Sequence, residues 1–422
     1  MKKILAFTIF ILLLGACSSP KKVLQKSTLK LLSSDFYNSQ FTGLLVVDPK
    51  TNDTILNYNG KKYFTPASNT KIFTLFTALN MLPDSIPAFK YLTENDTLYV
   101  QGTGDPTLLH PYFQNNPIPE FMKGYEHIKL ITNNLQDNKF GPGWAWDDYD
   151  YYYQPEKGSF PVYGNVVTMS HSLIPNISPE YFKDSVVPLS YSKNRAESSN
   201  TFFYSPSRVD TLEVPFKTDS VLTKKLLSDA LQRDIAILPK IPTGQLKTKY
   251  SVPTDTVLKR MMQESDNFLA EQLLILSSSM LSDTLSTDRV RKHVLENLLS
   301  DLKQPPRWVD GSGLSRYNLF TPESIVKVLQ KMYGEIPRER LFDIFPAGGR
   351  SGTLESWYTG NPEPYIYAKS GSLGNVYCLS GYLITKSGKT LIFSFMNNHF
   401  QSPSAEVKQR METTFERIRD TY

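Results

Sequence analysis

The feature that most constrains the fold is a change of composition in the middle of the chain. Between residues 83 and 242 the sequence is rich in Pro, Asn, Asp and Tyr, with short alternating runs such as 97–100 and 211–214. The flanking segments instead carry longer runs typical of strands and helices. We therefore expect an α/β domain, an antiparallel sheet flanked by helices, built from 27–82 and 243–422 and split by 83–242 as a β-rich insert.

Local patterns place secondary structure on both sides of the insert. Alternating or continuously apolar runs predict strands at 41–47, 54–58, 377–385 and 391–396. Apolar residues at helical spacing predict helices at 29–37, 257–276, 288–302, 322–333 and 405–418. Helices at both ends of the chain, with antiparallel strands beside each, favour one interrupted α/β domain.

Composition narrows the class of protein. A chain of 422 residues exceeds one typical domain, and 40% apolar with 12% aromatic residues is ample for a buried core. The net charge is only +5 and no dense Lys/Arg run occurs, so nucleic acid is a poor candidate partner. The five histidines lie in no metal-ligand spacing, and neither a Gly-x-Ser-x-Gly turn nor a Gly-rich phosphate loop is present. We expect no metal and no cofactor.

The N-terminus has the pattern of an export signal. Two lysines precede an apolar run at 4–14 that is too short to span a bilayer, and Gly15-Ala16 stands directly before Cys17. Residues 1–17 thus resemble a bacterial lipoprotein signal, cleaved before a lipidated Cys17, with 18–26 as a tether. An ordinary secretory signal with an incidental cysteine is the alternative.

Lipid on Cys17 would anchor the protein without a transmembrane helix. Ser18, rather than an acidic residue, follows the cysteine, which by analogy with Gram-negative sorting favours the outer membrane. We therefore expect a periplasmic protein that meets the membrane only through its N-terminal lipid. With Cys17 lipidated, Cys378 has no disulfide partner, and its apolar surroundings predict a buried strand residue.

A serine and a lysine three residues apart, Ser68 and Lys71, offer a reactive pair. Their spacing puts both side chains on one helix face, where an amine can activate a hydroxyl. Ser-x-x-Lys also begins at other serines, among them Ser18, Ser27 and Ser324, but only Ser68 lies where a loop runs into an apolar helical segment. A plain helix start is the alternative reading.

Two further short motifs follow in order. Residues 265–267 form Ser-x-Asn within a helical region, and 369–371 form Lys-Ser-Gly at the entry to a strand. Each motif recurs elsewhere, with Ser-x-Asn at Ser192 and Ser198 and Lys-Ser-Gly at Lys386, where a hairpin turn explains it. Helix capping and a solvated strand end are the alternative readings of the two motifs.

The order Ser-x-x-Lys, Ser-x-Asn, Lys-Ser-Gly resembles the penicillin-recognising serine enzymes, the penicillin-binding proteins and serine β-lactamases. Longer strings resemble the low-molecular-mass class C penicillin-binding proteins, the D-Ala-D-Ala carboxypeptidase/endopeptidase family (peptidase family S13). These strings lie at 102–108, 265–273, 310–316 and 349–354. Ser370 stands where threonine is commoner in the third motif, and it keeps a hydroxyl. The resemblance implies the penicillin-recognising serine transpeptidase-like fold, split by the long insert.

The motif residues can support acyl transfer. Ser68 would be the nucleophile, and Lys71 its base, with a pKa lowered by desolvation and by the nearby Lys369. Ser265 can pass a proton to the leaving amine, and Asn267 can bind the substrate peptide and Lys71. The remaining motif residues would bind substrate. Lys369 and Ser370 would bind its terminal carboxylate, and the backbone N–H groups of Ser372 and Ser68 would bind the oxyanion. Gly371 would let the backbone of the strand approach the substrate closely.

These roles predict a serine-type D-Ala-D-Ala carboxypeptidase that also cuts peptidoglycan cross-links as a DD-endopeptidase, with β-lactams as covalent inhibitors. A β-lactamase or esterase of the same fold is one alternative. A non-catalytic peptidoglycan-binding lipoprotein is another, and the aromatic and acidic cluster at 144–153 could serve it as a ligand platform. Packing of the insert against its neighbour is the blander reading of that cluster.

Overall fold

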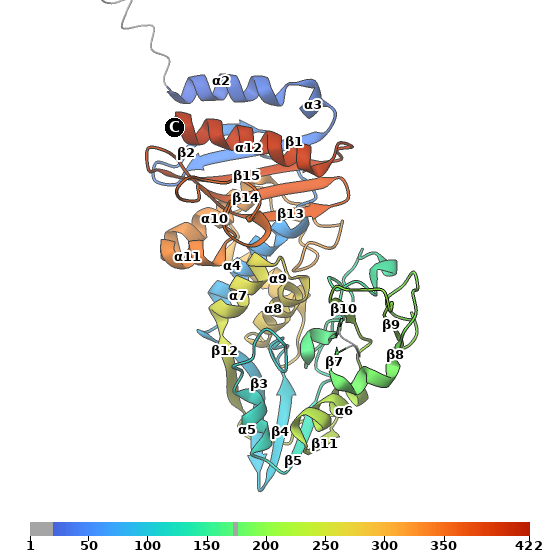
Figure 1. Ribbon diagram of the computed structural model, residues 1–422. Helices are drawn as coiled ribbons and strands as arrows, with labels where there is room; N and C mark the ends of the chain where they lie inside the picture. Colours follow the sequence, from blue (N-terminus) through green and yellow to red (C-terminus); the bar gives the residue numbers. More distant parts are fainter. Residues whose placement is uncertain (1–19, 172–175) are drawn as a thin grey trace, which may run out of the picture. The chain divides into compact units, whose positions relative to one another are not determined.

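The computed structural model describes residues 20–171 and 176–422 (Figure 1). They fall into two compact units, the first made of the chain up to Asn69 together with Leu319–Tyr422, the second of Thr70–Asn318. These two units do not have the bounds predicted for the catalytic domain (27–82 and 243–422) and the insert (83–242). The predicted division into domains stays a prediction. The predicted signal and Cys17 lie outside the described residues.

The first unit is built on a five-stranded antiparallel sheet in the order β13-β14-β15-β1-β2. Its strands are β1 (Phe41–Asp48), β2 (Asp53–Tyr58), β13 (Ile366–Leu373), β14 (Val376–Ile384) and β15 (Thr390–Asn398). The strands predicted at both ends of the chain are therefore confirmed, and they pair with one another. β13 is an edge strand.

Helices cover both faces of this sheet (Figure 1). On one side lie α2 (Pro20–Leu32), the short α3 (Asp35–Asn38) and α12 (Ser404–Thr421), and on the other α10 (Pro322–Glu335) and α11 (Arg338–Ile344). Because both faces are covered, β14 and β15 are buried along almost their whole length. Thr321 caps α10 by accepting from the Ser324 N–H, and the Ser324 hydroxyl accepts in return from the Thr321 N–H, so Ser324 lies in the first helical turn as expected.

The first helix differs from the expected tether. α2 begins at Pro20, inside the segment 18–26 that was predicted to be a tether, and Leu24 is fully buried. Leu24 and Leu32 belong to the same apolar core as Val407 and Phe415 of α12. Burial of these leucines against α12, about 2 kcal/mol each, makes this segment helical.

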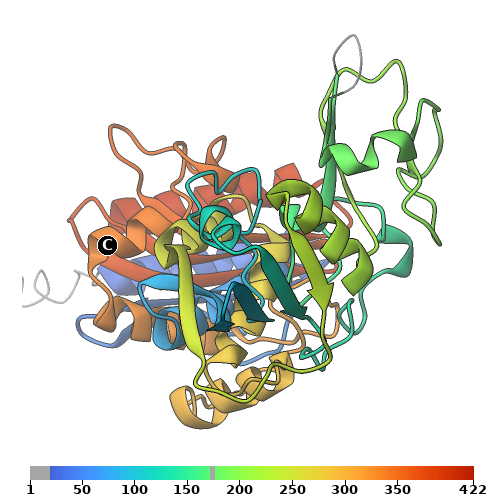
Figure 2. The same cartoon turned by 90° about the horizontal axis from the view of Figure 1, so that it is seen from below.

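The second unit has its own five-stranded sheet, in the order β11-β5-β4-β3-β12 (Figure 2). The strands are β3 (Ser85–Glu94), β4 (Thr97–Gly102), β5 (His127–Ile131), β11 (Asp234–Ile237) and β12 (Lys247–Pro253). β4, β5 and β11 run parallel, and β3 and β12 complete the sheet as antiparallel neighbours. A smaller sheet holds β6 (Val166–Ser170), β7 (Asn176–Ser178) and β10 (Leu212–Pro215), and β8 (Val186–Val187) pairs with β9 (Phe202–Phe203).

The region predicted as β-rich also contains two helices, α5 (Ile118–Lys123) and α6 (Ser220–Leu231). α6 starts at an Asp219 cap and buries four leucines in the core of this unit. Among residues 20–171 and 176–422, no helix combines the length and apolarity needed to cross a membrane.

The remaining helices of the second unit surround the motifs. A 3-10 turn, η1 (Ala67–Thr70), leads from the first unit into α4 (Lys71–Met81), which packs against α8 (Asn267–Ser279). α7 (Thr254–Gln263) precedes α8, and α9 (Thr287–His293) follows it. The single helix expected over 257–276 is therefore two helices, and the break falls on the Ser-x-Asn motif.

Candidate active site

Ser68 lies on the 3-10 turn that starts α4. Its three companions in η1, Ala67, Asn69 and Thr70, are fully buried, whereas Ser68 is half-buried. Ala67 has a φ of +48°, a strained conformation for a residue with a side chain. The turn thus holds one hydroxyl at the surface of an otherwise buried segment, the setting expected of a nucleophile.

Asn69 ties this turn to the sheet of the first unit. Its Nδ2 donates to the backbone oxygen of Lys369, at 2.9 Å, and to that of Cys378, at 3.3 Å. Lys369 is on β13 and Cys378 on the neighbouring β14, so Asn69 holds the residue after Ser68 against both strands. Cys378 is fully buried in its strand, as the sequence predicts.

Gly371 brings β13 close to the same turn. A Cβ at this position would lie 2.6 Å from the backbone oxygen of Pro66 and 2.9 Å from the nitrogens of Ser68 and Asn69. Those distances are too short for any side chain. Glycine is required here because the two backbones touch, whereas the close approach to a substrate peptide expected of Gly371 stays a prediction.

The other predicted residues of the third motif lie along β13. Lys369 is fully buried, and its Nζ donates to the backbone oxygen of Ser370 at 3.0 Å. The hydroxyls of Ser370 and Thr353 are hydrogen bonded at 2.7 Å, which joins β13 to the Gly-Thr-Leu turn at 352–354. Ser372 is exposed. The first unit therefore brings Ser68 together with 369–372.

In the second unit Lys71 is fully buried at the first position of α4. Its Nζ donates to Asn267 Oδ1 at 2.6 Å and to the backbone oxygen of Ser312 at 2.7 Å. Desolvation lowers the pKa of Lys71 to about 8, against the opposing fields of three carboxylates, those of Asp266, Asp310 and Glu271. The burial of Lys71 therefore explains why desolvation lowers its pKa, as predicted.

The Ser-x-Asn motif forms the junction between α7 and α8. Ser265 has a φ of +57° and is half-buried, and Asp266 caps α8 by accepting from the Leu269 N–H. Asn267, the first residue of α8, accepts from Lys71 and donates from Nδ2 to the backbone oxygen of Tyr153 at 3.0 Å. The segment therefore contains both a capped helix start and the Ser-x-Asn motif, so the capping interpretation does not exclude the motif.

The aromatic cluster supports this half of the site. Besides the Tyr153 contact, Trp144 Nε1 donates to Asp310 at 2.9 Å, whereas Trp146 and Tyr152 are 73% and 65% exposed. The segment thus combines a packing role at its two ends with exposed rings between them.

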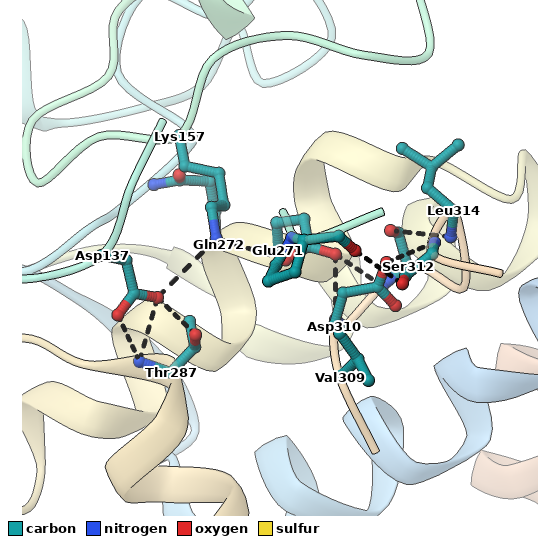
Figure 3. Close-up of polar contacts among 12 residues, drawn as sticks. Asp137, Lys157, Glu271, Gln272, Thr287, Val309, Asp310, Ser312 and Leu314 are labelled. Atoms are coloured by element: carbon teal, nitrogen blue, oxygen red, sulfur yellow. Dashed lines mark hydrogen bonds and ion pairs between the residues drawn. The ribbon is translucent and has the colours of Figure 1, made fainter. Parts of the chain in front are cut away.

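Sequence reasoning missed two buried acids, Glu271 and Asp310 (Figure 3), whose charges act on Lys71. Glu271 Oε1 accepts from the backbone N–H groups of Gly311, at 2.9 Å, and Ser312, at 2.8 Å. Asp310 accepts four hydrogen bonds, from Trp144, Gly313, Ser315 and Asn318. Both acids fall inside the strings 265–273 and 310–316. A carboxylate within an apolar or Gly-rich run is the signal that could have found them.

The structure therefore places the predicted residues in two groups, Ser68 with 369–372 in the first unit and Lys71 with Asn267 in the second. The chain itself links the groups, since Lys71 follows Ser68 by three residues. Among the residues that the structure describes, no three His, Cys, Asp or Glu side chains form a candidate metal site.

Comparison with known proteins identifies the family. The model of the "D-Ala-D-Ala carboxypeptidase 3 (S13) family" matches residues 26–180 and 216–418. The D-alanyl-D-alanine carboxypeptidase DacB of Haemophilus influenzae is 24% identical, over 90% of each chain. The crystal structure of penicillin binding protein 4 (dacB) from Haemophilus influenzae covers 91% of this chain and 97% of its own, at 22% identity and a TM-score of 0.70.

A second solved structure is similar at lower identity. The penicillin G-acylated predatory endopeptidase Bd3459 from Bdellovibrio bacteriovorus, in complex with immunity protein Bd3460, covers 90% of this chain and 93% of its own. Its identity is 18% and its TM-score 0.53. These similarities confirm the predicted fold class, and the family match confirms the predicted class of enzyme, a serine-type D-Ala-D-Ala carboxypeptidase. The chain belongs to the D-Ala-D-Ala carboxypeptidase 3 (S13) family.

Proposed function

We propose that this enzyme removes the terminal D-alanine from peptidoglycan stem peptides, and also cuts their cross-links, through an acyl-enzyme on Ser68. The observation that carries the proposal is the state of Lys71, an amine buried three residues after a half-buried serine, with its pKa lowered to about 8. At pH 7 about a tenth of such an amine is neutral, against less than about a thousandth of an ordinary lysine, and this neutral fraction can accept a proton.

In the first step the neutral Lys71 amine takes the Ser68 hydroxyl proton while Oγ attacks the carbonyl carbon of the D-alanyl peptide bond. The C–N bond of the tetrahedral intermediate then breaks, and the leaving amine receives a proton through Ser265. Water hydrolyses the resulting ester and returns the proton, which restores Ser68. The contact between Lys71 and Asn267 supports these roles because it fixes the amine beside the motif that receives the substrate.

Substrate binding is assigned to β13. As an edge strand it can pair with an extended peptide, and Gly371 brings that edge next to the Ser68 turn. We assign the backbone N–H groups of Ser68 and Ser372 to the oxyanion, worth about 3 kcal/mol if pre-organised. Lys369 and the Ser370 hydroxyl, held by Thr353, are assigned to the terminal carboxylate of the substrate.

Endopeptidase activity needs no further chemistry, because a cross-link presents the same D-alanyl carbonyl with a longer leaving group. Two similar proteins support this part of the proposal, the carboxypeptidase DacB and the endopeptidase Bd3459. The acylation of Bd3459 by penicillin G supports β-lactams as covalent inhibitors. The lipoprotein pattern before Cys17 supports a lipid-anchored enzyme in the periplasm, sorted to the outer membrane.

Fluorescent penicillin tests the assignment of Ser68. The full chain should become covalently labelled, and Ser68→Ala should abolish labelling while its thermal unfolding stays unchanged. Labelling of the alanine variant at the wild-type rate would remove Ser68 from the proposal. Slow release of the bound label is expected of a peptidase, whereas rapid turnover of free penicillin would favour a β-lactamase.

Mass spectrometry of digested muropeptides tests the substrate. Loss of a terminal D-alanine and conversion of cross-linked dimers to monomers are both expected, and both should disappear in Ser68→Ala. Binding of peptidoglycan that survives Ser68→Ala, with no product released by the wild type, would favour the non-catalytic wall-binding reading. Labelling with radioactive palmitate that Cys17→Ala abolishes would support the lipid anchor.

A further inference from the structure

One helix determines two hydrogen bonds of the Lys71 amine, those to Asn267 and to Ser312. Glu271 follows Asn267 by four residues on α8, so both side chains project from the same face of this helix. Asn267 accepts from Lys71 directly, whereas Glu271 holds the Gly311 and Ser312 N–H groups, and the Ser312 carbonyl accepts from Lys71. The second contact therefore depends on Glu271 through a loop that Glu271 binds.

A buried cation faces the other oxygen of Glu271 (Figure 3). Lys157 is only 5% exposed, and its Nζ lies 3.9 Å from Glu271 Oε2 and 3.7 Å from Asp137 Oδ2. Asp137 in turn accepts from the N–H and hydroxyl of Thr287 at the start of α9. Glu271 is 1% exposed, so burial, together with the nearby Asp310 carboxylate, raises its pKa, and Lys157 opposes that rise as the counter-charge.

We propose that Glu271, balanced by Lys157, is a positioning residue that aims the Lys71 amine by fixing the Ser312 carbonyl. The inference rests on the proposed function, in which neutral Lys71 is the base. A neutral amine has two N–H bonds and one lone pair. Two fixed acceptors, Asn267 Oδ1 and the Ser312 carbonyl, use both N–H bonds and so set the direction of the lone pair.

The charge of Glu271 also acts on Lys71. Carboxylates of Asp266, Asp310 and Glu271 face the amine, and each favours its protonated form. Glu271→Gln keeps an oxygen acceptor for the Ser312 loop but removes one of these charges. Its effect on position should be small, and the pKa of Lys71 should fall. Glu271→Ala removes both the acceptor and the charge.

The rate of acylation by fluorescent penicillin, measured across pH on the full chain, separates these effects. Glu271→Gln should move the midpoint of the rate profile to lower pH while the plateau stays within about tenfold of wild type. Glu271→Ala should lower the plateau about 100-fold, the size expected when a catalytic group is misplaced. Ser277→Ala is the matched control on α8, because its hydroxyl donates to the Leu273 carbonyl of its own helix.

A second measurement does not depend on activity. In protein labelled with 13C at the lysine ε-carbons, the Lys71 signal is assigned by its loss in Lys71→Arg and titrated by NMR. Glu271→Gln should lower its midpoint, and Lys157→Met should lower it too, because the unbalanced Glu271 carboxyl takes up a proton. Failure of wild type to react with penicillin would count against the proposed function alone, since the titration would still report on Glu271.

The inference is overturned if Glu271→Gln changes neither the Lys71 titration nor the acylation profile, or if a folded Glu271→Ala acylates at the wild-type rate. Should Glu271→Ala fail to fold, the glutamine variant decides by its titration. Lys157→Met tests the pairing of Lys157 with Glu271. This substitution should lower thermal stability less in the Glu271→Gln background than in the wild type.

Discussion

The Lys71 amine donates a 2.6 Å hydrogen bond to Asn267 Oδ1, 196 residues further along the chain. Lys71 begins α4 and Asn267 begins α8, so this hydrogen bond joins the first residues of two helices that pack together. The helix start at Lys71 was expected, whereas Asn267, expected inside one helix over 257–276, begins a second helix. Their meeting depends on the packing of α4 against α8.

Asn267→Ala should lower the rate of penicillin acylation about 100-fold, because Lys71 loses its direct acceptor and the Tyr153 carbonyl loses its donor. Stopped-flow or gel-based labelling rates provide the measurement. Asn80→Ala is the matched control, since the Asn80 side chain bonds only the Phe76 carbonyl within α4. Equal rates for the two variants would argue that Asn267 has no part in acylation.

Acylation should depend on pH with a midpoint near 8. Lys71 acts as a base only when neutral, and desolvation lowers its pKa to about 8 from the ordinary 10.5, so the rate should rise with pH and level off above the midpoint. A midpoint near 10 would contradict a buried neutral base.

The same pKa shift predicts a contribution to stability. Between about pH 8 and 10.5 the unfolded chain still holds the Lys71 proton that the folded protein has released. The unfolded state therefore binds more protons in this window, and the free energy of unfolding should rise with pH by up to about 3 kcal/mol from this group. The measurement is the difference between wild type and Lys71→Met in urea unfolding at pH 7.5 and 10, and an equal difference at both pH values would contradict the shift.

The strands were predictable because their signal is local. Apolar runs such as those that became β1 and β15 are buried on both faces, and each run carries its pattern regardless of its partner. The pairing of the two strands, which joins residue 41 to residue 398, has no local signal. The expectation of the whole fold came instead from the order of the three short motifs, through the family that this order resembles.

The parts that sequence reasoning missed all depend on tertiary contacts. The apolar spacing of 257–276 continues through Ser265, so the left-handed turn that separates α7 from α8 is invisible in it. Glu271 looks like a surface residue of a helix until the Gly311 and Ser312 N–H groups are placed against it. Leu24 looks like part of a tether until α12 covers it.

Gly371→Ala should abolish or greatly slow acylation and destabilise the fold by about 1–3 kcal/mol. The added Cβ would overlap the Pro66 oxygen and the backbone nitrogen of Ser68, and neither backbone can move without the other. Gly334→Ala is the matched control, because its Cβ would meet nothing within 4 Å on α10 and should be neutral or stabilise by up to about 1 kcal/mol. Wild-type labelling of Gly371→Ala would mean that the close contact is dispensable.

Ser370→Ala should raise the KM for D-Ala-D-Ala peptides about tenfold or more, since a hydrogen bond to a carboxylate is lost. Ser370→Thr keeps the hydroxyl and should behave like wild type. Thr353→Val tests the support, because it removes the 2.7 Å contact that orients the Ser370 hydroxyl, and a smaller rise in KM is expected. A threonine variant as impaired as the alanine variant would show that the hydroxyl is not what matters.

Asp310→Ala should destabilise the protein by roughly 3–5 kcal/mol, because Asp310 is 1% exposed and four donors, three of them on buried residues, would lose their acceptor. Urea unfolding gives the free-energy difference. Asp288→Ala is the matched control, since its carboxylate is exposed and its loss should cost no more than about 0.5 kcal/mol. If Asp310→Ala costs less than about 1 kcal/mol, another acceptor must hold the 310–315 loop, and the Ser312 carbonyl would reach Lys71 without this carboxylate.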